Sequence, residues 1–220
     1  MKLIRRVTGQ RGSGITHPLL TTSSGGKFGK TEDGAVWLDA RRTSPYQMYQ
    51  YWLQTADTDV VRYLKLFTFL EQNRILELES EVQTRPDQRE AQRVLAAECT
   101  GIIHGVDTVR TVEAASRILF SPSEEIPTEE AIAVLAREMP ATVISRAEFD
   151  SQIGLVDLLL RTNLAESKAS ARKLIEGGGV YVNNARQERP QKVISMADSK
   201  WPGTIMLRVG KKNHHLVQIL

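Results

Sequence analysis

Hydrophobic side chains recur with a helical period over roughly one hundred residues that begin at Ser44. Ser44 and Pro45 have the residue types of an N-cap and a first-turn proline, and one face then carries Tyr46, Tyr49, Trp52 and Leu53. The same reasoning predicts five more helices. Asp59 caps the first, the second covers residues 71–82, and the third runs from a capping box of Asp87 and Glu90 to His104. The fourth begins at Asp107, and the fifth runs from Thr128 to Met139. Residues 44–140 are therefore predicted to form a compact helical unit whose core holds Cys99 and the aromatic side chains.

The last 70 residues have the pattern of a small unit that mixes helices and strands. Helices are expected at residues 155–160 and 166–176, and strands at residues 180–182, 204–209 and 215–219. Three glycines at 177–179 end the second helix, and Asn183 with Asn184 suits the positive φ of a tight turn. Residues 141–153 lack a period and are predicted to be a linker.

The helix at residues 166–176 is expected to carry a basic edge. At 100° per residue, its hydrophobic positions cluster within one arc, at Ala171, Leu174 and Ile175. Lys168 and Arg172 lie one turn apart on the flank of that arc, whereas Lys173 points the opposite way. Two cations are thus predicted to be exposed beside the packed face.

Residues 1–43 resemble the closing part of an α/β unit. Leu3 and Ile4 with two arginines suggest the last turn of a helix, and residues 15–21 suggest a short strand. The last turn of a helix, without the turns that precede it, has nothing to pack on. We therefore expect this segment to be the tail of a larger domain.

Composition narrows the class of protein. The chain has 220 residues, of which 41% are hydrophobic and 25% charged, as in ordinary soluble globular proteins. No run approaches the roughly 18 apolar residues of a membrane span, and no signal peptide is recognised at the start, so a cytoplasmic location is expected. Cys99 is the single cysteine and the four histidines show no ligand spacing, so no bound metal is predicted.

Charge is distributed unevenly along the chain. The net charge of +3 divides into +4 over residues 1–35, −7 over residues 36–150 and +6 over residues 151–220. Basic ends around an acidic middle suggest that an anionic partner binds at the ends. The alternative is an ordinary solvated surface.

The sharpest local signal is the segment Gly25-Gly26-Lys27-Phe28-Gly29-Lys30-Thr31. Glycines allow close backbone approach, and two ammonium groups three residues apart can converge on one polyphosphate. A P-loop is the obvious rival, but Ser24 stands where its first glycine is required, and Glu32-Asp33-Gly34 follows where a helix should begin. A surface loop that happens to hold two lysines is the other alternative.

This segment and its surroundings resemble the bacterial type of tyrosine–tRNA ligase, a class I synthetase. The resemblance runs from the lysine–glycine segment through Trp37-Leu38-Asp39, Thr43-Ser44-Pro45-Tyr46, Arg62-Tyr63-Leu64-Lys65 and Phe67-Thr68-Phe69-Leu70. It resumes at Ser167-Lys168, Ala171-Arg172 and residues 179–183, which are similar to the small RNA-binding domain named after a ribosomal protein. The segment corresponds to the tyrosyl version of the Lys-Met-Ser-Lys-Ser loop, and the resemblance covers essentially the whole chain.

The resemblance implies an α+β fold in three parts. Residues 1–43 are expected to be a remnant of the α/β nucleotide-binding catalytic domain, residues 44–140 a helical anticodon-binding domain, and residues 154–220 a small α+β RNA-binding domain after the linker 141–153. The His-x-Gly-His motif of the family is absent from this sequence. The chain is therefore expected to correspond to the C-terminal half of the enzyme.

The resemblance also implies roles for particular residues. Lys27 and Lys30 would stabilise the pyrophosphate that leaves ATP, Thr31 would supply the hydroxyl of the motif's closing serine, and Gly29 would contact ATP with the two lysines. Lys168 and Arg172 on the helix, with Lys211 and Lys212 in a basic turn, would bind tRNA. ATP is expected as a substrate with Mg²⁺, without a protein-bound metal or prosthetic group.

Two functions are consistent with the sequence. The first is a tyrosine–tRNA ligase that activates tyrosine with ATP and transfers it to tRNA(Tyr) in translation, as a homodimer in the full-length family. The second is a catalytically inactive tRNA-binding module. The resemblance favours the first for the family, whereas these 220 residues alone are expected to be inactive.

Overall fold

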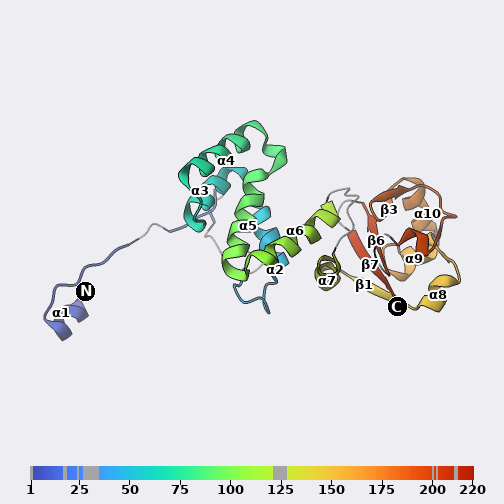
Figure 1. Ribbon diagram of the computed structural model, residues 1–220, viewed down its shortest axis with the longest axis horizontal. Helices are drawn as coiled ribbons and strands as arrows, with labels where there is room; N and C mark the ends of the chain where they lie inside the picture. Colours follow the sequence, from blue (N-terminus) through green and yellow to red (C-terminus); the bar gives the residue numbers. More distant parts are fainter. Residues whose placement is uncertain are drawn as a thin grey trace.

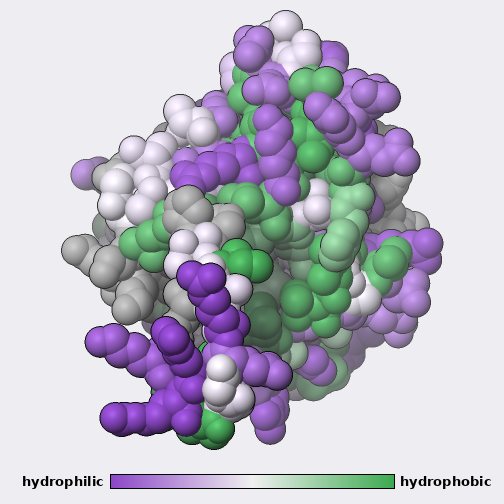
Figure 2. Space-filling model, turned by 90° about the vertical axis from the view of Figure 1, so that its left-hand side faces the viewer, coloured by the Kyte–Doolittle hydropathy of each residue, from purple (hydrophilic) through white to green (hydrophobic). Residues whose placement is uncertain are grey.

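The computed structural model describes residues 2–16, 19–23, 25–26, 35–120, 128–199, 201, 203–210 and 213–220. Figure 1 shows a short helix, α1 (Lys2–Thr8), at the end of an extended segment, followed by a helical unit and then a sheet unit. Helix α1 has no buried residue, and Leu3 and Val7 are about three-quarters exposed at 73% and 75%. Figure 2, viewed from the α1 end, shows hydrophobic side chains exposed among hydrophilic ones. The described part of residues 15–21 forms no strand, because it has no neighbouring sheet to pair with.

The helical unit follows the predicted order of helices. It comprises α2 (Pro45–Leu53), α3 (Asp57–Phe67), α4 (Gln72–Thr84), a 3-10 turn (Pro86–Gln88), α5 (Glu90–His104), α6 (Val106–Phe120) and α7 (Glu129–Glu138). Ser44 caps α2 as predicted: its side chain accepts from the Gln47 amide, and the Gln47 side chain accepts from the Ser44 amide. Thr128 likewise caps α7 by accepting from the Ala131 amide.

Two predicted caps are wrong. Helix α3 begins at Asp57 after Ala56, so Asp59 lies in its first turn and binds elsewhere. Helix α5 begins after Arg89, which has a left-handed φ of 50°, and the 3-10 turn takes up Asp87. Pro86 starts that turn and separates Asp87 from the helix it was expected to cap.

The sheet unit contains a five-stranded sheet of order β1-β7-β6-β3-β4. Its strands are β1 (Ala141–Ile144), β3 (Val180–Val182), β4 (Ala185–Gln187), β6 (Thr204–Val209) and β7 (Asn213–Ile219). All neighbours in it are antiparallel except β1, which pairs parallel to β7. The predicted positive φ is present at Asn183 and Asn184, between β3 and β4.

Residues 141–153, predicted as a linker, carry regular structure. They contain β1, the short helix α8 (Arg146–Asp150) and the first residue of β2 (Ile153–Gly154), which pairs with β5 (Val193–Ile194). Each of these elements is too short to give a recognisable hydrophobic period, and the partner strands of β1 and β2 lie far away in the sequence. A second 3-10 turn, η2, occupies Met196–Asp198.

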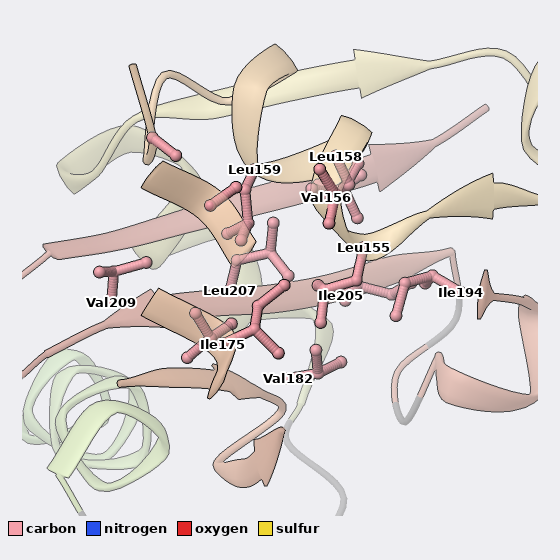
Figure 3. Packing of buried hydrophobic residues seen from close by; sticks show 14 of the residues in the cluster. Leu155, Val156, Leu158, Leu159, Ile175, Val182, Ile194, Ile205, Leu207 and Val209 are labelled. Atoms are coloured by element: carbon pink, nitrogen blue, oxygen red, sulfur yellow. The ribbon is translucent and has the colours of Figure 1, made fainter. Parts of the chain in front are cut away.

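Helices α9 (Leu155–Arg161) and α10 (Lys168–Glu176) pack on one face of the five-stranded sheet. Figure 3 shows the side chains that meet there: Leu155, Val156, Leu158 and Leu159 from α9, Ile175 from α10, Val182 from β3, and Ile205, Leu207 and Val209 from β6. Most of them are fully buried, so this core fixes the orientation of α10 and therefore of its charged flank.

The opposite face of the sheet packs against the helical unit. Met206 of β6, Leu216 of β7 and Trp201 belong to one hydrophobic cluster with Val112 and Ala115 of α6 and with Ala131, Ile132 and Leu135 of α7. The Asn184 amide also donates to the Ile118 carbonyl oxygen at 3.0 Å. The helical unit and the sheet unit thus share a core. A separate cluster fills the other end of the helical unit, between α3, α4 and α5.

Candidate nucleic-acid interface

Helix α10 carries the predicted basic edge. Ser167 caps it by accepting from the Ser170 amide at 3.1 Å, so the helix begins two residues later than the pattern suggested. Ala171 and Ile175 are buried, as predicted, whereas Lys168, Arg172 and Lys173 are exposed. The packed face therefore holds Lys168 and Arg172 one turn apart toward solvent.

The two cations differ in what surrounds them. Lys168 Nζ lies 2.8 Å from Asp157 Oδ1 of α9, and both side chains are more than half exposed. An exposed ion pair of this kind contributes little stability and is easily exchanged for another anion. Arg172 has no hydrogen bond or ion pair with the residues that the structure describes, so its guanidinium is available to a ligand.

Arg186 of β4 extends the basic surface to the end of α10. Gly178 has a φ of 66°, and a Cβ built there would lie 1.8 Å from Arg186 Nη2. The guanidinium therefore rests on bare backbone, where glycine alone leaves room. Arg186 Nε is also 3.3 Å from Glu188 Oε1, an exposed pair.

A row of aromatic and basic side chains crosses the sheet from Arg186. Tyr181 of β3 is the register partner of Arg186 on β4 and of Arg208 on β6. The guanidinium carbon of Arg208 lies 3.6 Å from the centre of the Tyr181 ring, a cation–π contact. Val180 and Val182 face the core, so Tyr181 faces away from it.

The turn that holds Lys211 and Lys212 lies outside the described residues, as do Lys27, Gly29, Lys30 and Thr31 of the lysine–glycine segment. The residue before the basic turn is described. Gly210 donates its amide to the Gly179 carbonyl oxygen at 2.8 Å, and Arg208 Nη1 donates to the Gly210 carbonyl oxygen at 2.6 Å. The root of the turn is therefore held beside the glycines that end α10.

A second basic surface lies on the helical unit. A groove of about 810 Å³ opens between α2, the first 3-10 turn, α5 and α6, and three arginines line it: Arg89, Arg93 and Arg117. Arg89 donates to the Leu53 and Thr55 carbonyl oxygens at 2.8 and 3.1 Å, and Arg93 donates to Glu90 at 2.7 Å. The first two arginines are thus fixed in place.

The wall of this groove also carries polar side chains and two acids, Asp87 and Glu113. Burial, reinforced by the charge of Glu113, raises the pKa of Tyr49 to about 12, so its phenol stays protonated. Gln50 donates to Ser116 Oγ at 3.0 Å. Side chains of this kind can hydrogen-bond the edges of unpaired bases, and the arginines can contact phosphates.

Sequence reasoning found α10 and missed most of this surface. Arg186, Arg208 and Tyr181 lie on three strands, and only the strand pairing brings them together. The alternation of Val180, Tyr181 and Val182 is a signal that could have placed Tyr181 on the sheet face opposite α9 and α10. Arg89, Arg93 and Arg117 come from two helices, and no local pattern joins them.

No helix within the described residues is long and apolar enough to cross a membrane. In the same part of the chain, no group of three or more histidine, cysteine, aspartate and glutamate side chains is placed to hold a metal ion.

Comparison with known proteins gives two matches to family models. Residues 1–121 match the model of class I tRNA synthetases for tryptophan and tyrosine. Residues 131–217 match the model of the C-terminal domain found in tyrosine–tRNA ligases of the SYY type. Together the two models include both the helical unit and the sheet unit.

Curated relatives are similar along the whole chain. A tyrosine–tRNA ligase of Roseiflexus castenholzii is 39% identical over 221 residues, which cover 100% of this chain and 52% of the relative. One of Bacillus pumilus is 42% identical and covers 99% of this chain and 51% of the relative. The chain thus spans about half the length of the curated relatives it matches. A C-terminally truncated mitochondrial tyrosyl-tRNA synthetase of Coccidioides posadasii, a solved structure, shares 47% identity over 45% of this chain and 25% of its own, with a TM-score of 0.39.

Proposed function

Since the chain belongs to the class I tRNA synthetase family of the tryptophan and tyrosine enzymes, we propose that it supplies the tRNA-binding part and the signature loop of a tyrosine–tRNA ligase. The proposed reaction joins tyrosine to ATP with release of pyrophosphate and then transfers tyrosine to tRNA(Tyr). The full-length ligase is expected to act as a homodimer in the cytoplasm.

The observation that carries the tRNA-binding part is the pair of exposed cations on α10, Lys168 and Arg172, with Arg186 at the end of that helix. Arg172 is free of described partners, Lys168 has only an exposed one, and the Arg186 guanidinium lies against Gly178 at the end of α10. On the face of the sheet opposite α9 and α10, the Arg208 guanidinium stacks on the Tyr181 ring. Cations that track phosphates, with a ring on which a base can stack, are the usual elements of RNA recognition. Lys211 and Lys212 are proposed to join this surface, because Gly210 is held beside it.

The chemistry of tyrosine activation is proposed to involve the lysine–glycine segment. Lys27 and Lys30 would neutralise charge that develops on the leaving pyrophosphate, and Thr31 would donate a hydrogen bond from its hydroxyl. Gly29 would allow close approach of the backbone to ATP. Mg²⁺ would arrive on the phosphates of ATP, since this ion is commonly bound through substrate phosphates.

Domain boundaries follow as part of the proposal. Residues 1–43 would belong to the catalytic domain, residues 44–140 would form the anticodon-binding domain, and residues 154–220 the small RNA-binding domain. We count residues 141–153 with the last of these, because β1 pairs with β7 and β2 pairs with β5.

The tRNA-binding proposal is tested by the salt dependence of affinity. Each phosphate contact releases counterions, so replacing Lys168 and Arg172 together by alanine should flatten the log–log salt slope by about one to two units and weaken binding. Arg172→Ala alone should account for more of the loss than Lys168→Ala, because Lys168 must first give up Asp157. Affinity for tRNA(Tyr) is measured at several salt concentrations by a filter or fluorescence assay.

Lys173→Ala is the matched control, because Lys173 lies on the same helix and is exposed on its other side. Its salt line should superimpose on that of the wild type. If the double variant also superimposes, α10 does not bind RNA. A chain with no measurable affinity for tRNA(Tyr) would contradict the proposal as a whole.

The alternative of an inactive tRNA-binding module predicts the same binding and no catalysis. The two are separated by tyrosine-dependent exchange of pyrophosphate into ATP. The 220 residues alone are expected to give no exchange above buffer, whereas a ligase that also carries an N-terminal half of the length found in the relatives should give it. Exchange absent from both would leave the binding module as the function.

A further inference from the structure

Asp59 binds the chain just before the lysine–glycine segment. Both of its carboxylate oxygens accept from the Ser23 amide at 3.0 Å, and Oδ2 also accepts from the Ser23 hydroxyl at 2.9 Å. Asp59 is 6% exposed, in the first turn of α3, where a negative charge is favoured. Both carboxylate oxygens of Asp59 thus bind a single residue, which lies 36 positions earlier in the sequence.

Two neighbours on α3 strengthen the same contact. The Thr58 hydroxyl donates to Ser23 Oγ at 3.1 Å, and Arg62 Nη1 donates to the Thr21 carbonyl oxygen at 3.1 Å. Residues 21 and 23 are therefore bound by side chains from consecutive turns of α3. Ser23 itself is exposed, so packing does not explain its position.

The contact continues into a closed turn. The Thr22 amide donates to the Gly26 carbonyl oxygen at 2.9 Å, and the Gly25 amide donates to the Thr22 carbonyl oxygen at 2.9 Å. Lys27 follows Gly26 directly in the sequence. A carboxylate that fixes Ser23 therefore also fixes the point from which the chain enters the lysine–glycine segment.

The far side of the segment is held close to the start of α2. The Trp37 amide donates to the buried Thr43 Oγ1 at 2.9 Å, and the guanidinium carbon of Arg42 lies 3.2 Å from the centre of the Trp37 ring. Thr22 and Ser23 on one side, and Ala35 and Val36 on the other, line one open cavity of about 930 Å³ against α2 and α3. Both stems thus lie beside α2 and α3 of the helical unit.

We infer that Asp59 is a positioning residue, which fixes on the helical unit the stretch Ser23 to Gly26, from which the chain enters the lysine–glycine segment. The inference rests on the proposed function for its catalytic consequence. The anchoring itself is a property of this chain alone. It links the unit proposed to bind tRNA with the segment proposed to act on ATP.

The first test measures amide hydrogen exchange at Ser23 in the 220-residue chain. Loss of a hydrogen bond to a charged acceptor predicts exchange about tenfold faster, or more, in Asp59→Ala than in the wild type. Asp59→Asn keeps one acceptor oxygen and should exchange at an intermediate rate. Thermal unfolding monitors whether each variant keeps its fold.

Asp57→Ala is the matched control. Asp57 is the other acid in the first turn of α3, and it accepts from Gln92 Nε2 at 2.6 Å, not from Ser23. Its removal costs the helix a similar charge but should leave Ser23 exchange unchanged. Equal acceleration in both variants, or none in Asp59→Ala, would overturn the anchor.

The second test uses a complete ligase in which this chain follows a catalytic N-terminal half. Asp59→Ala should lower kcat of tyrosine activation at least fivefold, with KM for tyrosine unchanged, and Asp59→Asn should recover part of it. If Asp59→Ala leaves kcat unchanged while exchange at Ser23 is accelerated, the positioning role is rejected, but the contact between Asp59 and Ser23 is confirmed. A wild-type ligase without tyrosine-dependent exchange would reject the proposed function, and the positioning role with it, while the first test still decides the anchor.

Discussion

Burial of His215 on β7, between β1 and β6, links the stability of the sheet to pH. His215 Nε2 lies 2.8 Å from Thr142 Oγ1, which joins β7 to β1, and the residue is 7% exposed. Burial lowers the pKa of His215 below its ordinary value of 6.5. The folded state therefore holds this side chain neutral at a pH where the unfolded chain already binds a proton.

The free energy of unfolding should fall as the pH drops through 6.5 toward the lowered pKa of His215. The contribution is complete above 6.5, because neither state then binds the proton. His215→Gln keeps a polar partner for Thr142 and should flatten the dependence between pH 7.5 and 5.5. Urea unfolding at a series of pH values measures the slope. Part of the pH dependence should remain in the variant, since burial lowers the pKa of His104 as well. An identical slope in wild type and variant would contradict the assignment of the pH dependence to His215.

Among the elements, α2 depends most visibly on a local signal. Ser44 and Gln47 satisfy each other's amides, Pro45 needs no partner at the first position, and the helix then buries Tyr46, Met48 and Tyr49. Ser44→Ala should reduce the free energy of unfolding by about 1 kcal/mol, the usual cost of losing an N-cap. Ser44→Asp keeps an acceptor and should cost much less. Denaturant unfolding of the two variants compares them, and equal losses would show that the cap is unimportant.

The elements also show where prediction from sequence succeeds and fails. Caps at Ser44 and Thr128, and the hydrophobic arc of α10, depend on residues within a few positions of each other, so the sequence was sufficient to predict them. Asp59 has the residue type of a cap, but its carboxylate binds Ser23, which is distant in the sequence. Strand β1 likewise forms because it pairs with β7, which is also distant. The candidate site divides in the same way: Lys168 and Arg172 were predictable from one helix, whereas Arg186, Tyr181 and Arg208 required the strand register.

For the whole molecule, the shared cluster between the sheet and the helical unit decides how the chain unfolds. Met206 is fully buried there against residues of α6 and α7. Met206→Ala should reduce the free energy of unfolding by about 2–5 kcal/mol. The helical circular-dichroism signal and tryptophan fluorescence should shift together, because Trp201 lies in the same cluster.

Val143→Ala is the comparison, since Val143 is on β1 but 54% exposed. It should change stability by no more than about 0.5 kcal/mol, as exposed substitutions usually do. Two separate transitions in the wild type, one for each signal, would show that the helical unit and the sheet unit unfold independently despite their common core.

The place of β7 in the sheet has a consequence for the newly made chain. Synthesis proceeds from the N-terminus, at about 5–20 residues per second, so β1 leaves the ribosome well before β7. Yet β7 lies between β1 and β6, and β1 has no other neighbour in the sheet among the residues that the structure describes. Until β7 has been made, the backbone of β1 stays unpaired, and an unpaired strand edge can pair with the wrong strand or with another chain. The preceding helices can pack during this interval, so closure of the sheet on β1 follows the formation of the helical unit.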